Sequence, residues 1–173
     1  MRGRVRAPRL KIKLANNTSG LKSLYSSVPS LNLVRLRSIH LNWQGPTVTA
    51  RIDLPEYPDN APPEWIDRGH DTLQIHLQFV AVENLSAHGW IPSSPVSIEF
   101  MPQEERRLQA CITGDGMELS LACSDSFTVG HVSSFGSTDS SMKDETYSFL
   151  QPLDARRFTT LPDTHESTFY ERI

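Results

Sequence analysis

The chain has 173 residues, a net charge of -3 and an apolar fraction of 38%. This length can bury one core without staples, and two cysteines are too few for a disulfide scaffold. No apolar run approaches the roughly 20 residues that a membrane helix needs, so we expect no membrane association. Twelve prolines and nine glycines favour short strands and many turns over long helices.

The charge is distributed unevenly along the chain. Residues 1–52 contain ten Lys or Arg and no acid, whereas residues 53–173 contain seven Lys or Arg and all 20 acids. We interpret residues 1–27 as a basic, disordered arm. Contact of residues 2–13 with nucleic acid is a hypothesis, but a terminal extension without a role is the favoured interpretation. This basic start lacks the apolar segment of a secretory signal, so we expect a cytoplasmic protein.

Alternating apolar residues predict strands from residue 31 onward. Residues 31–43 change the face that carries their apolar side chains, which indicates a bulge or burial on both faces. A turn at 44–46 and the alternating segment 47–54 complete a hairpin. Further strands are predicted at residues 71–85, 95–100 and 126–135. The proline-rich segment 55–65 is expected to be an ordered loop that ends in one helical turn around Pro63–Asp67.

Residues 107–123 predict a second hairpin. A two-residue turn at Gly114 and Asp115 would pair Ile112 with Met117 and place all apolar residues of both strands on one face. In that register Cys123 points to the apolar face and Cys111 to the other face, so the two thiols cannot form a disulfide.

Together these segments predict a mainly β protein of six to seven strands. We expect an antiparallel meander that forms a sandwich or a curved sheet, with an α+β fold containing one short helix as the alternative. The β-rich domain would span residues 28–135. Residues 136–173 would form a polar tail, partly disordered or docked.

Candidate catalytic chemistry is sparse. His40, His76 and His131 lie in predicted strands and could meet across a sheet, but no pair has the spacing of a metal motif, so isolated histidines are favoured. No G-x-S-x-G elbow is present. The sequence therefore predicts no enzyme activity, no cofactor and no metal.

An acidic loop from Asp53 to Asp71 is the strongest candidate for a binding surface. It holds six acids against Arg68 alone and is stiffened by prolines. Aromatic residues among acids on a stiff loop are typical of a preorganised protein-binding surface. The predicted partner-binding residues are Asp53, Glu56, Tyr57, Asp59, Glu64 and Trp65. The alternative is a solvated crossover with Trp65 tucked onto the core.

The segment SLNLVRLRSIHLNWQGPTVTARIDLPEYPDNAPPEW, residues 30–65, resembles the immunity protein 50 family of bacterial polymorphic toxin systems. The likeness rests on the first hairpin, the RIDLPEYPD step and the Pro-Pro-x-Trp that follows, and it extends over residues 28–135. The resemblance implies a cytoplasmic protein that binds and neutralises a cognate toxin without catalysis. It implies no cofactor and carries no residue-level inhibitory site.

The acidic surface is compatible with a basic toxin, such as a nuclease, because complementary charge speeds encounter. Three alternatives remain open at this stage. They are a β-sheet domain that binds a small ligand, an enzyme that uses the strand histidines, and nucleic-acid binding through residues 2–13.

Overall fold

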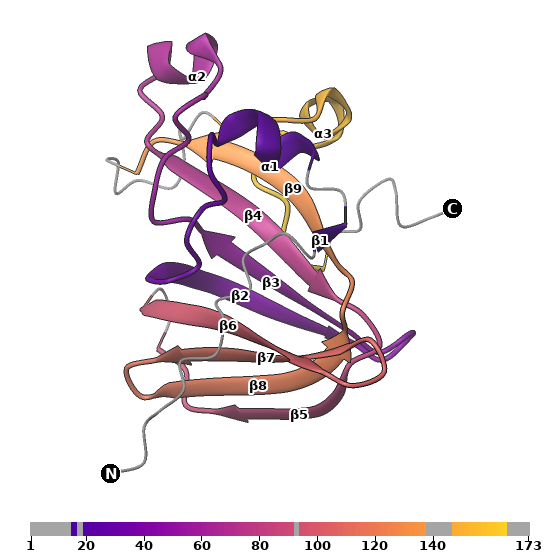
Figure 1. Cartoon of the computed structure of the whole chain (residues 1–173). Helices are drawn as coiled ribbons and strands as arrows, with labels where there is room; N and C mark the ends of the chain where they lie inside the picture. Colours follow the sequence, from indigo (N-terminus) through magenta and orange to yellow (C-terminus); the bar gives the residue numbers. More distant parts are fainter. Residues whose placement is uncertain (1–14, 17–18, 92–93, 138–146, 166–173) are drawn as a thin grey trace.

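The computed structural model describes residues 15–16, 19–91, 94–137 and 147–165 (Figure 1). The strands are β1 (Ala15–Asn16), β2 (Val34–Asn42), β3 (Thr47–Asp53), β4 (Thr72–Phe79), β5 (Glu83–His88), β6 (Pro95–Gln103), β7 (Arg107–Gly114), β8 (Met117–Ser124), β9 (Phe127–Phe135) and β10 (Ser148–Phe149). The helices are α1 (Ser19–Leu24), α2 (Pro63–Asp67) and α3 (Pro152–Arg157).

All strands belong to one sheet in the order β1-β9-β4-β3-β2-β6-β7-β8-β5, with β10 beside β9. Every pairing among the described strands is antiparallel except that of β1 with β9. The mainly β prediction is confirmed, and of the predicted architectures the single curved sheet is the observed one. The predicted meander order was wrong, because β9 pairs with β4, β2 with β6 and β5 with β8. The described strands number ten rather than six or seven, because β1 and β10 are two-residue strands and residues 71–85 form two strands.

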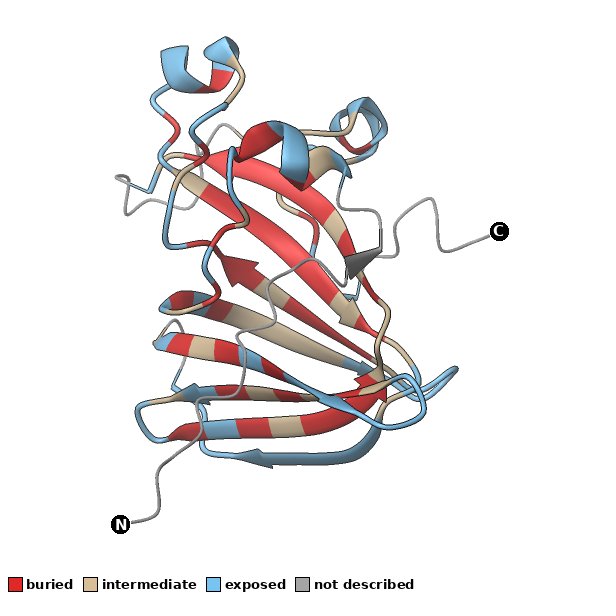
Figure 2. Cartoon of the chain, viewed as in Figure 1, coloured by how far each residue is buried: buried red, intermediate tan, exposed pale blue. Residues whose placement is uncertain are grey.

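The sheet changes direction between β2 and β6. These strands pair at only two positions, Val34 with Val96 and Arg35 with Pro95. The half made of β9, β4, β3 and β2 therefore lies above the half made of β6, β7, β8 and β5 (Figure 1). Buried residues recur along the long strands of both halves except β5, all of whose residues are exposed (Figure 2).

Aromatic side chains fill the space where the two halves face each other. The ring centroid of Phe100 on β6 lies 4.9 Å from that of Phe127 on β9. It also lies 6.2 Å from that of Phe79 on β4. All three residues are at most 3% exposed, so one core joins the two halves of the sheet.

The first predicted hairpin is confirmed, including the bulge. Strands β2 and β3 pair from Asn42 with Thr47, beside the turn, to Arg35 with Asp53. Their register shifts between Leu36 and Ser38. After this shift Ile39 lies opposite Ala50 and packs half-buried against the core, whereas Leu41, opposite Val48, is 59% exposed. The predicted helical turn is also confirmed as α2, with Pro63 at its first position, where a missing N–H costs nothing.

The second hairpin forms, but its predicted register was wrong by two residues. Met117 pairs with Gly114, and Ile112 pairs with Leu119, so the turn residues are Asp115 and Gly116. Gly116 takes a φ of +71°, a conformation that glycine adopts without steric cost. A shift of two keeps every side chain on its predicted face. Accordingly Cys123 is buried, Cys111 is half-buried, and both are free thiols as expected.

Segments on either side of the predicted domain take part in the fold. Helix α1 places Leu21 and Leu24, followed by Tyr25, in the core. At the other end, β10 pairs with β9. Helix α3 follows it and buries Asp154. The residues 2–13 considered for nucleic-acid contact lie outside the described part of the chain.

Candidate partner-binding surface

The loop between β3 and β4 projects from the top of the molecule and ends in α2 (Figure 1). It is tied to the body by backbone hydrogen bonds at both ends. The Leu54 N–H donates to Leu73 O at 2.9 Å, and the Asn60 N–H donates to Leu24 O at 2.9 Å. The Asp71 N–H donates to Phe135 O at 3.1 Å. Because these bonds come from three separate elements, the loop is held in one conformation.

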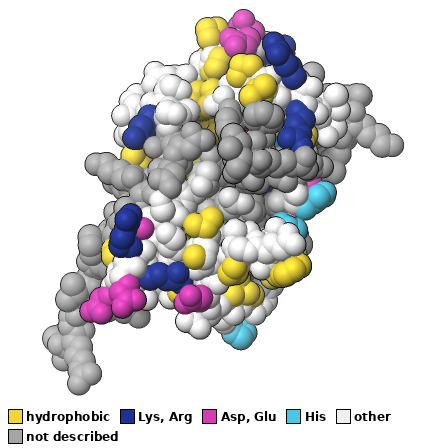
Figure 3. Space-filling view, turned by 90° about the vertical axis from the view of Figure 1, so that its right-hand side faces the viewer, with side chains coloured by type: hydrophobic (Ala, Val, Ile, Leu, Met, Phe, Trp, Pro, Cys, Tyr) yellow, Lys and Arg dark blue, Asp and Glu magenta, His cyan; other side chains and the backbone are white. Residues whose placement is uncertain are grey.

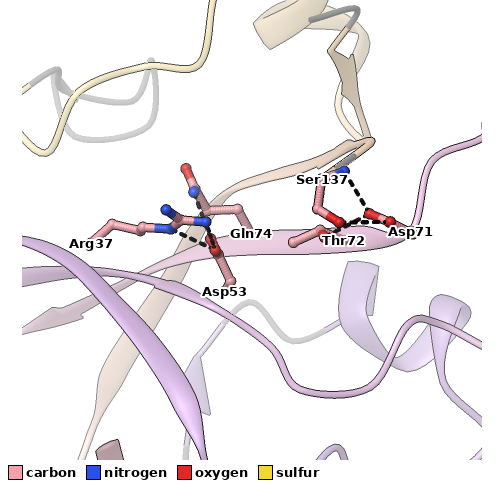
Figure 4. Close-up of polar contacts among 6 residues, drawn as sticks. All are labelled: Arg37, Asp53, Asp71, Thr72, Gln74 and Ser137. Atoms are coloured by element: carbon pink, nitrogen blue, oxygen red, sulfur yellow. Dashed lines mark hydrogen bonds and ion pairs between the residues drawn. The ribbon is translucent and has the colours of Figure 1, made fainter. Parts of the chain in front are cut away.

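Asp53 begins the loop but does not face solvent. It is 3% exposed. Its Oδ2 accepts a hydrogen bond from Arg37 Nε at 2.6 Å and lies 2.5 Å from Arg37 Nη2, while Oδ1 accepts one from Gln74 Nε2 at 2.7 Å (Figure 4). The carboxylate is therefore neutralised inside the protein, and its geometry joins β2, β3 and β4.

Tyr57 and Trp65, the two aromatic residues of the predicted binding set, also hold the loop in place. Trp65 is 2% exposed and belongs to the hydrophobic core, from which it anchors α2. Tyr57 is half-buried, and its hydroxyl lies 2.9 Å from Ser134 Oγ on β9. Burial raises the pKa of Tyr57, a rise that the contact with Ser134 opposes. Both side chains thus connect the loop to the upper half of the sheet.

Asp59 is exposed but already engaged. Its carboxylate accepts a hydrogen bond from the Ser26 N–H at 3.0 Å and another from the Ser26 hydroxyl. The hydroxyl contact, followed by the backbone one, lowers the pKa of Asp59 below its usual value. Nearby, the Tyr25 hydroxyl donates to Glu56 O at 2.7 Å. The segment after α1 therefore fixes the middle of the loop.

Asp71 closes the loop at its far end (Figure 4). Its carboxylate accepts hydrogen bonds from the Ser137 N–H at 2.8 Å, the Ser137 hydroxyl at 2.7 Å and the Thr72 hydroxyl at 2.8 Å. Burial acts to raise the pKa of Asp71, but these hydrogen bonds outweigh it and lower the pKa below its usual value.

The remaining acids of the loop face solvent. Glu56 and Glu64 are exposed, as is Asp67, which the predicted set did not include. Ile66 is 61% exposed beside them. Apolar, acidic and basic side chains lie together at the top of the molecule, where α2 is (Figure 3). The sequence of α2 could have indicated that Ile66 is exposed, because Trp65 occupies the buried position of this single turn.

Two of the three strand histidines meet. The imidazoles of His76 and His131 pack edge to face, with ring centroids 4.9 Å apart. His40 instead lies near His165, at 6.5 Å. Among the described residues, no group of three or more His, Cys, Asp or Glu is arranged to hold a metal ion. Likewise, no helix in the described part of the chain has the length and apolar content to cross a membrane.

The described residues thus form one β-sheet with an anchored loop, on which the exposed Ile66 neighbours exposed acids. Residues 17–133 match the family model named immunity protein 50, and the chain belongs to this family. No match to the chain was found among curated proteins or among solved structures.

Proposed function

We propose that this protein is a cytoplasmic bacterial immunity protein that binds a cognate toxin domain and neutralises it by occlusion, without catalysis. Membership of the immunity protein 50 family is the observation that carries the proposal. The anchored acidic loop supports it, because a preformed loop pays little ordering entropy when a partner binds.

We propose Glu56, Glu64 and Asp67 as the acids that contact the toxin, with Ile66 as the apolar centre of the contact. Asp53, Tyr57, Asp59 and Trp65 would act indirectly, because burial or hydrogen bonds commit them to holding the loop. An acidic surface suits a basic partner, and a nuclease domain is the partner class that this charge favours.

The first test is co-expression with the C-terminal domain of the protein encoded by the adjacent upstream gene. Growth rescue together with co-purification of the two proteins supports the immunity function and supplies the partner. A toxic neighbour that is not rescued, or a neighbour without toxicity, contradicts this pairing. Thermal stabilisation by a metabolite would then favour the alternative function, binding of a small ligand.

The contact surface is tested by reversing charges. The variant carrying Glu56→Lys, Glu64→Lys and Asp67→Lys should lose at least about tenfold in affinity for the toxin, mainly through slower association. Binding kinetics measured at low and moderate salt check this, since the loss should shrink as salt screens the charges.

A matched variant separates the loop from net charge. Glu99, Glu104 and Glu118 are also exposed but lie on strands β6 and β8 and in the β6–β7 turn, in the other half of the sheet. Their triple replacement by Lys changes the net charge equally. An equal loss of affinity in both variants would remove the loop from the mechanism, provided that both variants remain folded by circular dichroism.

A further inference from the structure

A row of polar side chains crosses the outer face of the upper half of the sheet. Ser38 on β2 pairs with Arg51 on β3, and Arg51 pairs with His76 on β4. His76 in turn lies opposite Gly130 on β9, and the next residue is His131. Neighbouring residues of β3 and β4 point into the core, so this row points away from it.

The two histidines of this row are nevertheless buried. His76 and His131 are each 4% exposed. Arg51 Nε, His76 Nε2 and both ring nitrogens of His131 are enclosed without a hydrogen-bond partner among the described residues. Another segment of the chain must therefore cover this polar face. Because the cover buries polar atoms that have no hydrogen-bond partner, its closed position costs free energy.

The cover is the C-terminal segment, residues 147–165. Asp154 Oδ2 on α3 lies 3.3 Å from His131 Nδ1, within ion-pair distance but not aligned for a hydrogen bond. The Phe158 ring packs edge to face on the His131 ring at 5.3 Å. Further on, the backbone of Pro162 faces the His76 imidazole.

The segment is attached by few regular contacts. β10 pairs with β9 at two positions, Ser148 with Ser134 and Phe149 with Ser133. One more backbone bond joins Leu150 N–H to Val132 O at 2.9 Å. Such an element opens at a lower free energy than the core strands, because it buries little apolar surface.

We propose that the C-terminal segment is a pH-sensitive cover, which stays closed over His76 and His131 at neutral pH and opens when mild acid protonates the buried His76 imidazole. The charged groups around the two histidines determine whether protonation opens or closes the segment. Arg51 faces His76 from β3, Asp163 faces it from the segment itself, and Asp154 faces His131 from α3. A positive charge on His76 meets the Arg51 guanidinium, and the Asp163 carboxylate only partly offsets that repulsion.

The pKa of His76 shifts in the direction that this proposal requires. Burial, followed by the charges of His131 and Arg51, lowers it from 6.5 to about 3 in the closed state. The open state therefore binds the proton more tightly. Closure is fully favourable above pH 6.5 and weakens as the pH falls below it, by about tenfold per unit until the closed-state pKa is reached.

Amide hydrogen exchange of the full chain tests the proposal. Exchange rates of peptides covering residues 148–158 are measured at pH 7 and pH 5 and corrected for the intrinsic pH dependence of exchange. The opening equilibrium constant should rise about 25-fold on acidification, as expected for one group with an open-state pKa of 6.5. The β7–β8 hairpin serves as an internal control and should keep its protection.

Two variants separate titration from packing. His76→Gln should reduce the effect of pH to about twofold or less, because the titrating group is gone. Phe158→Ala should open the segment at both pH values while leaving the roughly 25-fold ratio unchanged, because it removes only packing. The wild-type comparison decides the question even where a variant fails to fold. Unchanged protection of the segment, or equal loss of protection in the β7–β8 hairpin, overturns the proposal.

Discussion

At the scale of single residues, acids with similar sequence surroundings have different tasks. Asp53 and Glu64 both belong to the acidic loop, yet Asp53 is buried against Arg37 and Gln74 while Glu64 is exposed. The alternating pattern of residues 47–54 did not indicate that Asp53 is buried. It could not show that Arg37 reaches across from β2, because that contact depends on the sheet register.

Replacement of Asp53 by Ala should lower the free energy of unfolding by about 2–4 kcal/mol. The loss leaves the Arg37 guanidinium and the Gln74 amide without their shared acceptor in a largely buried position. Urea denaturation followed by circular dichroism measures the change. Asp67→Ala, at an exposed position of the same loop, should stay within about 0.5 kcal/mol, and a similar loss in both variants would contradict the structural role of Asp53.

At the scale of elements, the two hairpins of the lower half use different turns. The β7–β8 turn has Gly116 at positive φ, as its sequence allows. The β6–β7 turn places Glu105 and Arg106 both at φ +57°, and the Arg107 N–H donates to Glu104 O across it at 3.2 Å. Residues other than glycine rarely adopt this positive φ, so the backbone of the β6–β7 turn is strained.

A variant with Glu105→Asn and Arg106→Gly should therefore raise the free energy of unfolding by about 1 kcal/mol. Asn-Gly is the pair that accepts positive φ at both central positions, and the gain exceeds the loss of the exposed contact between Arg106 and Asp125. Thermal unfolding checks the shift. As a control, Asp115→Asn in the unstrained β7–β8 turn should change the free energy of unfolding by less than about 0.5 kcal/mol. If the Asn-Gly variant gains no stability, the β6–β7 turn is not strained.

At the scale of the whole molecule, the two halves of the sheet depend on a shared core more than on backbone pairing. Only two residue pairs join β2 to β6, whereas Phe79, Phe100 and Phe127 touch across the space between the halves. Phe100 is contributed by the lower half and its two partners by the upper half. These rings therefore contribute to holding the two halves together, within one core cluster that spans both.

Phe100→Ala should lower the free energy of unfolding by about 3–5 kcal/mol, because it leaves a cavity between the halves. Hydrogen exchange should speed up in both halves together, as a cooperative unit requires. Met101→Ala, at the adjacent position that is 39% exposed, is the control and should have a small effect. Faster exchange confined to the lower half would mean that the halves unfold separately.

The sequence by itself determined the fold class, the two hairpins, the turn at α2 and the separation of the cysteines, because alternation and turn residues act over a few neighbours. It also carried the resemblance to the immunity protein 50 family, which the family match bears out. Tertiary structure decided the rest. The burial of Asp53 and Trp65 and the meeting of His76 with His131 under the C-terminal segment depend on contacts between residues far apart in the chain. The register of β7 and β8, in contrast, follows from the local turn at Asp115 and Gly116. Local patterns fix which face a side chain takes, but only the packed molecule decides what covers that face.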